Sequence, residues 1–188
     1  EIENVITTQD KLYQALSAKG IVPDPATKEV LRYREATLFG FNFIKQKGFL
    51  STNAIIEIQK NIEKNNAGIR ILPGTALRNA ATNKVIYTPP DEYDTILKLM
   101  GNLESYLNEQ DDISPLIKMA IQHYQFESIH PFYEGNGRTG RIINILYLIL
   151  NDLLVSATLY LSDYIINNKS DYYRLLQEVR AKNSWEDR

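Results

Sequence analysis

The densest group of chemically capable residues in the chain is the stretch HPFYEGNGRTGR, residues 130–141. It combines one histidine, one carboxylate, three glycines and two arginines. Pro131 disfavours helical backbone for the residue before it, so a helix should end at His130. Glycine and asparagine then permit left-handed or closely approached backbone, and an apolar run follows from Ile142. We therefore expect a glycine-rich loop that enters the N-terminus of a helix.

A loop of this kind is suited to binding phosphate. It directs several backbone N–H groups at one place and adds the positive end of the helix dipole. Arg138 and Arg141 are three residues apart, hence neighbours in the first turns of the helix. A cation there opposes the dipole at a cost of about 0.3–1 kcal/mol, and the cost becomes a gain if a multiply charged anion is bound. The two arginines therefore indicate a polyphosphate ligand.

Glu134 and His130 add two further chemical capacities to the loop. A carboxylate repels phosphate unless a divalent cation lies between them, and Mg²⁺ is commonly held by one or two carboxylates and substrate phosphates. Glu134 therefore indicates a nucleotide bound with magnesium. His130 is the only group of the stretch that titrates near neutral pH, and it could accept a proton from an incoming hydroxyl. The spacing of His123 and His130 suits no common zinc site, so we interpret His123 as a structural or surface residue.

Two better-known glycine motifs do not explain this stretch. Gly135, Gly137 and Gly140 match the GxGxxG pattern, but that pattern requires a preceding β-strand and a parallel sheet. Here a helical pattern precedes the glycines, and no alternation of strands and helices follows. The Walker A pattern GxxxxGK[ST] occurs nowhere in the chain.

Helical spacing of apolar residues dominates the rest of the chain and predicts an all-α fold. Start and stop signals place the helices at about residues 8–20, 28–47, 51–65, 89–110, 114–130, 138–155 and 162–183. Ser114 and Pro115 are the expected cap and first residue of their helix. Ser170 or Asp171 is the expected cap in the last helix.

The exception to the helical pattern is residues 68–90. Two glycines, a polar centre and the β-favouring run Val85, Ile86 and Tyr87 predict a β-hairpin, although composition fits a plain connecting loop equally well. An isolated hairpin is marginally stable in water. If it forms, it should therefore lie on the helical body.

Length and composition limit the classes of protein. The 188 residues fit one domain. The 21 basic residues against 23 acidic ones do not indicate a general nucleic-acid surface. The absence of cysteine excludes disulfides, thiolate nucleophiles and cysteine-bound metals. The N-terminus has no signal-peptide pattern and residues 142–155 are too few to cross a bilayer. We expect a cytoplasmic protein whose chain extends beyond both ends of this sequence.

Residues 130–141 resemble the motif of the Fic family, HPFx[D/E]GNGRxxR, at every fixed position. The resemblance covers about residues 30–185 and includes a hairpin that ends in YTPP where the family has its flap. It implies a Fic-type helical bundle with a small β-hairpin flap, at about residues 70–88, over the active site. Residues 1–188 would form a single Fic domain.

The resemblance implies a protein adenylyltransferase, which transfers AMP from ATP to a Tyr, Ser or Thr hydroxyl of a target protein and releases pyrophosphate. His130 would be the general base, Glu134 would hold Mg²⁺, and Asn136 would hydrogen-bond the α-phosphate. The other implied contacts of ATP are the amides of Gly135 and Gly137, the side chains of Arg138 and Arg141, and Tyr173 beside the adenine. The implied flap residues, which would hold the target by strand addition, are Arg78, Val85, Ile86 and Tyr87.

The N-terminal residues 1–20 resemble the end of an inhibitory helix followed by a first helix of the domain. Many Fic proteins carry (S/T)xxxE(G/N), whose glutamate pairs with the last arginine of the motif. Glu3 and Asn4 match the end of this pattern, whereas its leading Ser or Thr would precede Glu1. The resemblance implies that Glu3 pairs with Arg141 and represses activity. The alternative is a solvated terminal glutamate.

Other functions stay open at this point. A Fic-like enzyme could use another phosphate donor or remove AMP at the same site, and a non-catalytic nucleotide-sensing module is a further alternative. The intact Glu134, Asn136 and arginine set favours ATP. Expected partners are a target protein, with self-modification and a homo-oligomer as options, but no membrane. Nucleic acid would be bound only through a domain outside this chain.

Overall fold

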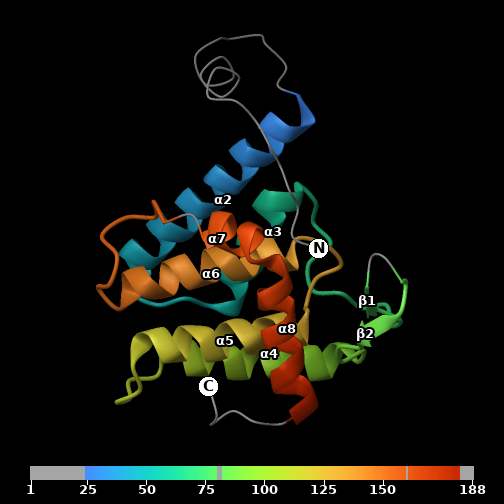
Figure 1. Ribbon diagram of the computed structural model, residues 1–188. Coiled ribbons are helices and arrows are strands. Elements are labelled where there is room, and N and C mark those ends of the chain that lie inside the picture. Colours follow the sequence, from blue (N-terminus) through green and yellow to red (C-terminus); the bar gives the residue numbers. More distant parts are fainter. Residues whose placement is uncertain (1–23, 80–81, 160, 183–188) are drawn as a thin grey trace. The chain divides into compact units, whose positions relative to one another are not determined.

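The structure is a computed structural model that describes residues 24–79, 82–159 and 161–182. These residues form helices and one two-stranded antiparallel sheet, so the all-α fold with one small hairpin is confirmed. The elements (Figure 1) are α2 (Pro25–Lys47), α3 (Thr52–Glu63), β1 (Leu77–Arg78), β2 (Val85–Tyr87), α4 (Tyr93–Asn108), α5 (Pro115–Ile129), α6 (Asn136–Leu150), α7 (Leu161–Asn167) and α8 (Lys169–Lys182). The chain divides into two compact units at about residue 157, which are described separately. The single domain expected over residues 1–188 stays a prediction.

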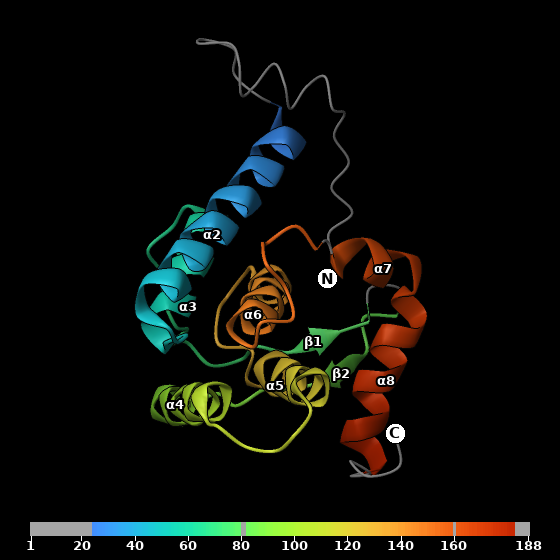
Figure 2. The same ribbon diagram turned by 90° about the vertical axis from the view of Figure 1, so that its left-hand side faces the viewer.

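Helix α6 is the core of the larger unit. Helices α2, α3 and α5 all pack against it, and α4 packs on α5; Figure 2 looks roughly along α6 and shows these helices around it. Every residue from Thr139 to Ile149 is buried, as expected for a helix that is apolar on all sides. Gly40 lets α2 approach closely, because a Cβ there would lie 2.5 Å from Cδ1 of Leu146.

Helix α2 begins three residues earlier than the sequence pattern predicts. Asp24 caps it by accepting a hydrogen bond from the Thr27 amide at 2.8 Å, and Pro25 is its first residue. Proline suits this position because its fixed φ is already helical and its missing N–H is not needed. Pro25 therefore belongs to the helix, and not to the loop that the two prolines of VPDPAT suggest.

The hairpin predicted in residues 68–90 is confirmed. Strands β1 and β2 pair antiparallel, with Leu77 opposite Tyr87. The Tyr87 hydroxyl donates a hydrogen bond of 2.9 Å to the carbonyl of Ser128 in α5. This contact fixes the base of the hairpin to the helical body, which is what a marginally stable hairpin needs.

Three local predictions are wrong. Residues 162–183 form two helices, because the pattern breaks at Asn168, whose carbonyl accepts from the Tyr172 amide. Ser170 and Asp171 therefore lie inside α8, and neither caps it. Ser114 is the N-cap of α5 and Pro115 its first residue, as predicted, although the Ser114 side chain makes no capping hydrogen bond. The helix expected to run to Val155 ends at Leu150. It begins at Asn136, so Arg138 and Arg141 lie in its first turns as predicted. The helix expected at residues 8–20 lies outside the described residues.

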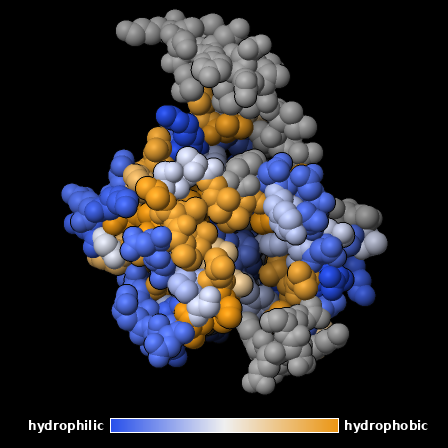
Figure 3. Space-filling model, turned by 60° about the vertical axis from the view of Figure 1, so that its left-hand side comes forward, coloured by the Kyte–Doolittle hydropathy of each residue, from blue (hydrophilic) through white to orange (hydrophobic). Residues whose placement is uncertain are grey.

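Hydrophobic side chains are not confined to the core. Ile71 and Leu72, just before the hairpin, are 65% and 67% exposed, and Val85 and Ile86 on β2 are also exposed. Figure 3 shows hydrophobic side chains gathered on one face of the molecule. Within the described ranges, no helix combines the length and the apolar character needed to span a membrane.

Candidate active site

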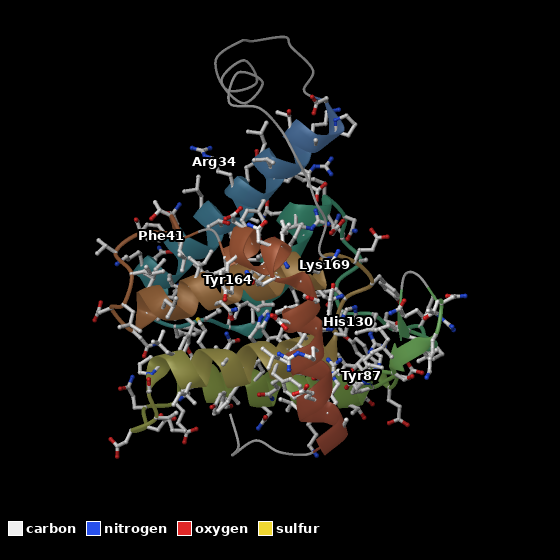
Figure 4. All side chains as sticks on the ribbon, viewed as in Figure 1. Arg34, Phe41, Tyr87, His130, Tyr164 and Lys169 are labelled. Atoms are coloured by element: carbon white, nitrogen blue, oxygen red, sulfur yellow. The ribbon has the colours of Figure 1, made fainter. Side chains whose placement is uncertain are left out.

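His130 ends helix α5 in a backbone conformation that is unusual for its residue type. Its φ of +48° and ψ of 58° are left-handed, and this region costs a residue with a Cβ about 1–2 kcal/mol. Its amide still donates to the carbonyl of Phe126 at 2.9 Å. In Figure 4 His130 lies beside Tyr87, where α5 meets the hairpin. The conformation turns the chain out of the helix and into the motif loop.

Asn136 closes the motif loop with its side chain. The amide group of Asn136 accepts a hydrogen bond of 3.0 Å from the Phe132 N–H and donates one of 2.7 Å to the Phe132 carbonyl. Both residues are buried, and the Phe132 ring packs on Phe126 with centroids 6.3 Å apart. Gln59 of α3 donates a further hydrogen bond of 3.2 Å to the carbonyl of Glu134. The loop is therefore held from inside and from α3.

The N-terminus of α6 presents backbone donors. Its cap is Gly135 at φ +78°, and no side chain caps the helix. The Thr139 amide donates to the carbonyl of Gly135 at 2.9 Å, so the amides of Asn136, Gly137 and Arg138 precede the helical ladder. These N–H groups and the dipole make the loop a site of positive potential.

The two arginines of the motif have different surroundings. Arg138 pairs with Glu29 of α2 at 2.5 Å and with Glu63 of α3 at 2.6 Å. Arg141 is 4% exposed, and its Nε has no hydrogen-bond partner in the part of the chain that the structure describes. A buried polar group without a partner is costly, so Arg141 is the stronger candidate to receive a ligand.

Arg141 runs back along the start of its own helix. Its Nη1 lies 3.2 Å from the place that a Cβ on Gly137 would take. A glycine at position 137 therefore leaves room for the guanidinium beside the backbone donors of the loop. This brings the buried cation and the helix N-terminus to one place.

His123 is a buried residue of helix α5 and precedes His130 by about two helical turns. Burial lowers its pKa, Arg141 lowers it further, and Glu127 and a hydrogen bond with the Gly140 backbone oppose the shift. The imidazole is therefore neutral near pH 7 and packs under α6. These surroundings agree with its interpretation as a structural residue.

Arg70 is a residue of the site that sequence reasoning missed. Its side chain has no exposed surface, and Nε donates to the carbonyl of His130 at 2.8 Å. Further hydrogen bonds reach the carbonyls of Pro90 and Ile129 and the carboxylate of Asp91. Burial lowers the pKa of Arg70, and the Asp91 carboxylate opposes this shift. No sequence pattern marked Arg70, because its partners lie 20 to 60 residues away.

Tyr133, in the loop that follows His130, contacts the segment that follows Arg70. Its hydroxyl accepts hydrogen bonds of 2.9 Å from the amides of Ile71 and of Leu72, which lowers its pKa. The segment that follows Arg70 is thus tied to the loop that follows His130. Sequence reasoning had no signal for this contact, since Tyr133 occupies a variable position of the motif.

Comparison with known proteins identifies the family. A sequence model described as Fic/DOC family matches residues 49–148, which is more than half of the chain. The chain belongs to the Fic/DOC family. A second model, for the N-terminal region of Fic/DOC proteins, matches residues 1–42.

Several Fic proteins resemble the chain. The protein adenylyltransferase Fic of Aedes aegypti is 30% identical over 129 residues, which are 68% of this chain and 23% of the relative. A probable protein adenylyltransferase of Aquifex aeolicus is 37% identical over 93 residues, or 50% of this chain and 26% of the relative. The crystal structure of a Fic family protein from Desulfovibrio desulfuricans superimposes with a TM-score of 0.77 at 24% identity, covering 96% of this chain and 54% of that one. The chain thus spans about a quarter of these curated relatives.

The structure brings the residues of the Fic motif together at one end of α6. His130, Glu134 and the segment 135–141 are contiguous, and Tyr87 reaches them through Ser128. Arg78, Val85 and Ile86 are exposed on the hairpin. Tyr173 lies in α8, in the other compact unit, and Glu3 lies outside the described residues.

A metal at this Fic site would depend on few protein ligands. Glu134 has an exposed side chain. Nowhere in the described ranges do three His, Asp or Glu residues form a group that could hold a metal ion. A single carboxylate is compatible with Mg²⁺ only when phosphate oxygens supply other ligands. The Glu134 carboxylate could therefore supply one ligand to such an ion, with phosphate oxygens as the others.

Proposed function

We propose that the chain carries the catalytic domain of a protein adenylyltransferase. It would transfer AMP from ATP to a Tyr, Ser or Thr hydroxyl of a target protein and release pyrophosphate. The observation that carries the proposal is the buried Arg141, with its unpaired Nε, beside the uncapped N-terminus of α6. Relatives named protein adenylyltransferase support the same reaction class.

The proposed step moves one proton and exchanges one bond. His130 takes the proton of the target hydroxyl, and the hydroxyl oxygen bonds to the α-phosphorus as the bond to the pyrophosphate oxygen breaks. Negative charge then grows on the leaving pyrophosphate. The amides at the start of α6 and the guanidinium of Arg141 are fixed donors at the place where this charge develops, and such preorganised donors stabilise the transition state.

The remaining residues are assigned the roles that the resemblance to the Fic motif implies. Glu134 would hold Mg²⁺, which neutralises phosphate charge when it is bound. The amides of Gly135 and Gly137 would face the α-phosphate. Asn136 would reach it through its backbone N–H, because its side chain is bonded to the Phe132 backbone. Arg138 would support Arg141 at the outer phosphates, although two carboxylates already pair with it.

The periphery of the site would serve the target, the adenine and regulation. Arg78, Val85, Ile86 and Tyr87 would align the target as an added strand, because they lie on a short, exposed hairpin. Tyr173 would border the adenine. Glu3 would pair with Arg141 and repress the reaction, since a buried cation without a partner at Nε attracts any available carboxylate.

An assay with labelled ATP tests this function. We expect the chain, incubated with Mg²⁺ and cell lysate, to transfer label from α-labelled but not γ-labelled ATP to protein. The Glu3→Gly variant should transfer more, and His130→Ala should transfer none. Arg34→Lys, a change at an exposed position of α2, should match the wild type.

The two labels also separate the alternatives. Transfer from γ-labelled ATP would indicate phosphate transfer. No transfer from either nucleotide, even by Glu3→Gly, would overturn the enzymatic proposal and favour a nucleotide-sensing module.

A further inference from the structure

We infer that Arg70 is a positioning residue that sets the orientation of His130 and couples it to the base of the hairpin; this rests on the proposed function. Three consecutive carbonyls at the end of α5 accept hydrogen bonds from Arg70. The backbone amide of Arg70 donates to Pro131 at 2.9 Å, Nε donates to His130 at 2.8 Å, and Nη2 reaches Ile129 at 3.5 Å.

These contacts supply hydrogen-bond donors to backbone carbonyls at the C-terminal end of α5. The last carbonyls of a helix have no partner within it and carry the negative end of its dipole. Arg70 supplies donors and a positive charge to that end of α5, at a site that is closed to water. The left-handed backbone of His130 fixes the direction of its carbonyl, and Arg70 holds that carbonyl. The direction in which the imidazole leaves the chain is therefore coupled to Arg70.

The same guanidinium contacts the segment between β2 and α4. Nη2 donates to the carbonyl of Pro90, and Nη1 lies 3.4 Å from the carboxylate of Asp91. Asp91 also accepts from the amide of Gly74 at 3.2 Å. Both ends of the hairpin region thus meet at Arg70. A displacement of the hairpin would be transmitted to His130 through one rigid, planar group.

Lysine cannot replace this group, although it carries the same charge. The guanidinium has five donors in a fixed fork, whereas an ammonium is a compact point charge on a flexible stem. We expect Arg70→Lys to preserve the fold while it leaves the His130 carbonyl without its aligned donor. Misplacement of a catalytic group by about 1 Å costs on the order of 100-fold in rate.

Two measurements on the full chain test the inference. The chain has only two histidines, so their ring resonances can be followed by NMR and assigned with His130→Ala. In Arg70→Lys the His130 resonance should shift while that of His123 stays in place. The kcat for AMP transfer should fall about 100-fold, with the KM for ATP within about twofold of the wild type.

The outcomes separate this inference from the proposed function. A folded Arg70→Lys variant in which the His130 resonance is unchanged would overturn the role of Arg70, whatever the activity. A wild-type chain that transfers no AMP would overturn the proposed function, and the NMR measurement would still decide the role of Arg70. If Arg70→Lys does not fold, Asp91→Ala replaces it, because this change removes one anchor of Arg70 at a partly exposed residue. A shift of His130 alone supports the inference, and no shift contradicts it. Arg34→Lys is the matched control and should move neither resonance.

Discussion

Replacing Gly135 by alanine should couple energetically to Glu63. Gly135 has a φ of +78°, and a Cβ there would lie 2.5 Å from Oε1 of Glu63. That oxygen cannot move without loss, because the same atom pairs with Arg138 at 2.6 Å and both side chains are at most 13% exposed. The left-handed backbone costs alanine about 1 kcal/mol, and the loss of a hydrogen bond between charged groups costs about 2 kcal/mol. Gly135→Ala should therefore destabilise the chain by about 3 kcal/mol.

A double-mutant cycle separates the two contributions. In a Glu63→Ala background the contact disappears, so Gly135→Ala should cost only about 1 kcal/mol, and the coupling energy should be about 2 kcal/mol. Urea denaturation followed by circular dichroism measures each variant. Gly101→Ala is the control, because a Cβ there meets nothing within 4 Å and alanine favours a helix. Equal costs of Gly135→Ala in both backgrounds would refute the reasoning.

Two further predictions concern the loop and the helix beneath it. Asn136→Ala should lower the free energy of unfolding, measured by urea denaturation, by about 3 kcal/mol. The change removes both hydrogen bonds to Phe132 and leaves buried backbone groups unpaired. A loss below about 1 kcal/mol would contradict this account. Burial lowers the pKa of His123 in the folded chain below its ordinary value of 6.5. The unfolded chain therefore binds a proton more readily than the folded one. The free energy of unfolding should be highest above pH 6.5 and fall as the pH drops below it. The fall is at most about 1.4 kcal/mol per pH unit, and His123→Gln should reduce it in urea titrations at pH 7.5 and 5.5.

The sequence predicts those parts of the fold that depend on local patterns. The spacing of apolar residues predicted helices α2 to α6, because the residues that form one face of a helix are only three or four positions apart in the sequence. The hairpin was ambiguous, because its fixation to the helical body through Tyr87 and Ser128 joins residues 41 positions apart. The break at Asn168 was missed because no proline or glycine marks it.

The distinction between local patterns and distant contacts also decides which parts of the site the sequence predicts. The contiguous motif from His130 to Arg141 could be read as a loop and a helix N-terminus. The partners of Arg138 could not, because Glu29 and Glu63 precede it by 109 and 75 residues. The structural use of the Asn136 side chain was also unexpected, since its type and position fit a ligand contact equally well.

The burial of α6 from Thr139 to Ile149 has a consequence for nucleotide binding. The donors at its N-terminus belong to the helix around which α2, α3 and α5 assemble. Their backbone is therefore ordered when the chain folds, and not when a ligand arrives. A binding site that is ordered in advance loses little conformational entropy on association. The phosphate end of a nucleotide should then meet a rigid receptor, whereas any adjustment to the target would fall to the hairpin.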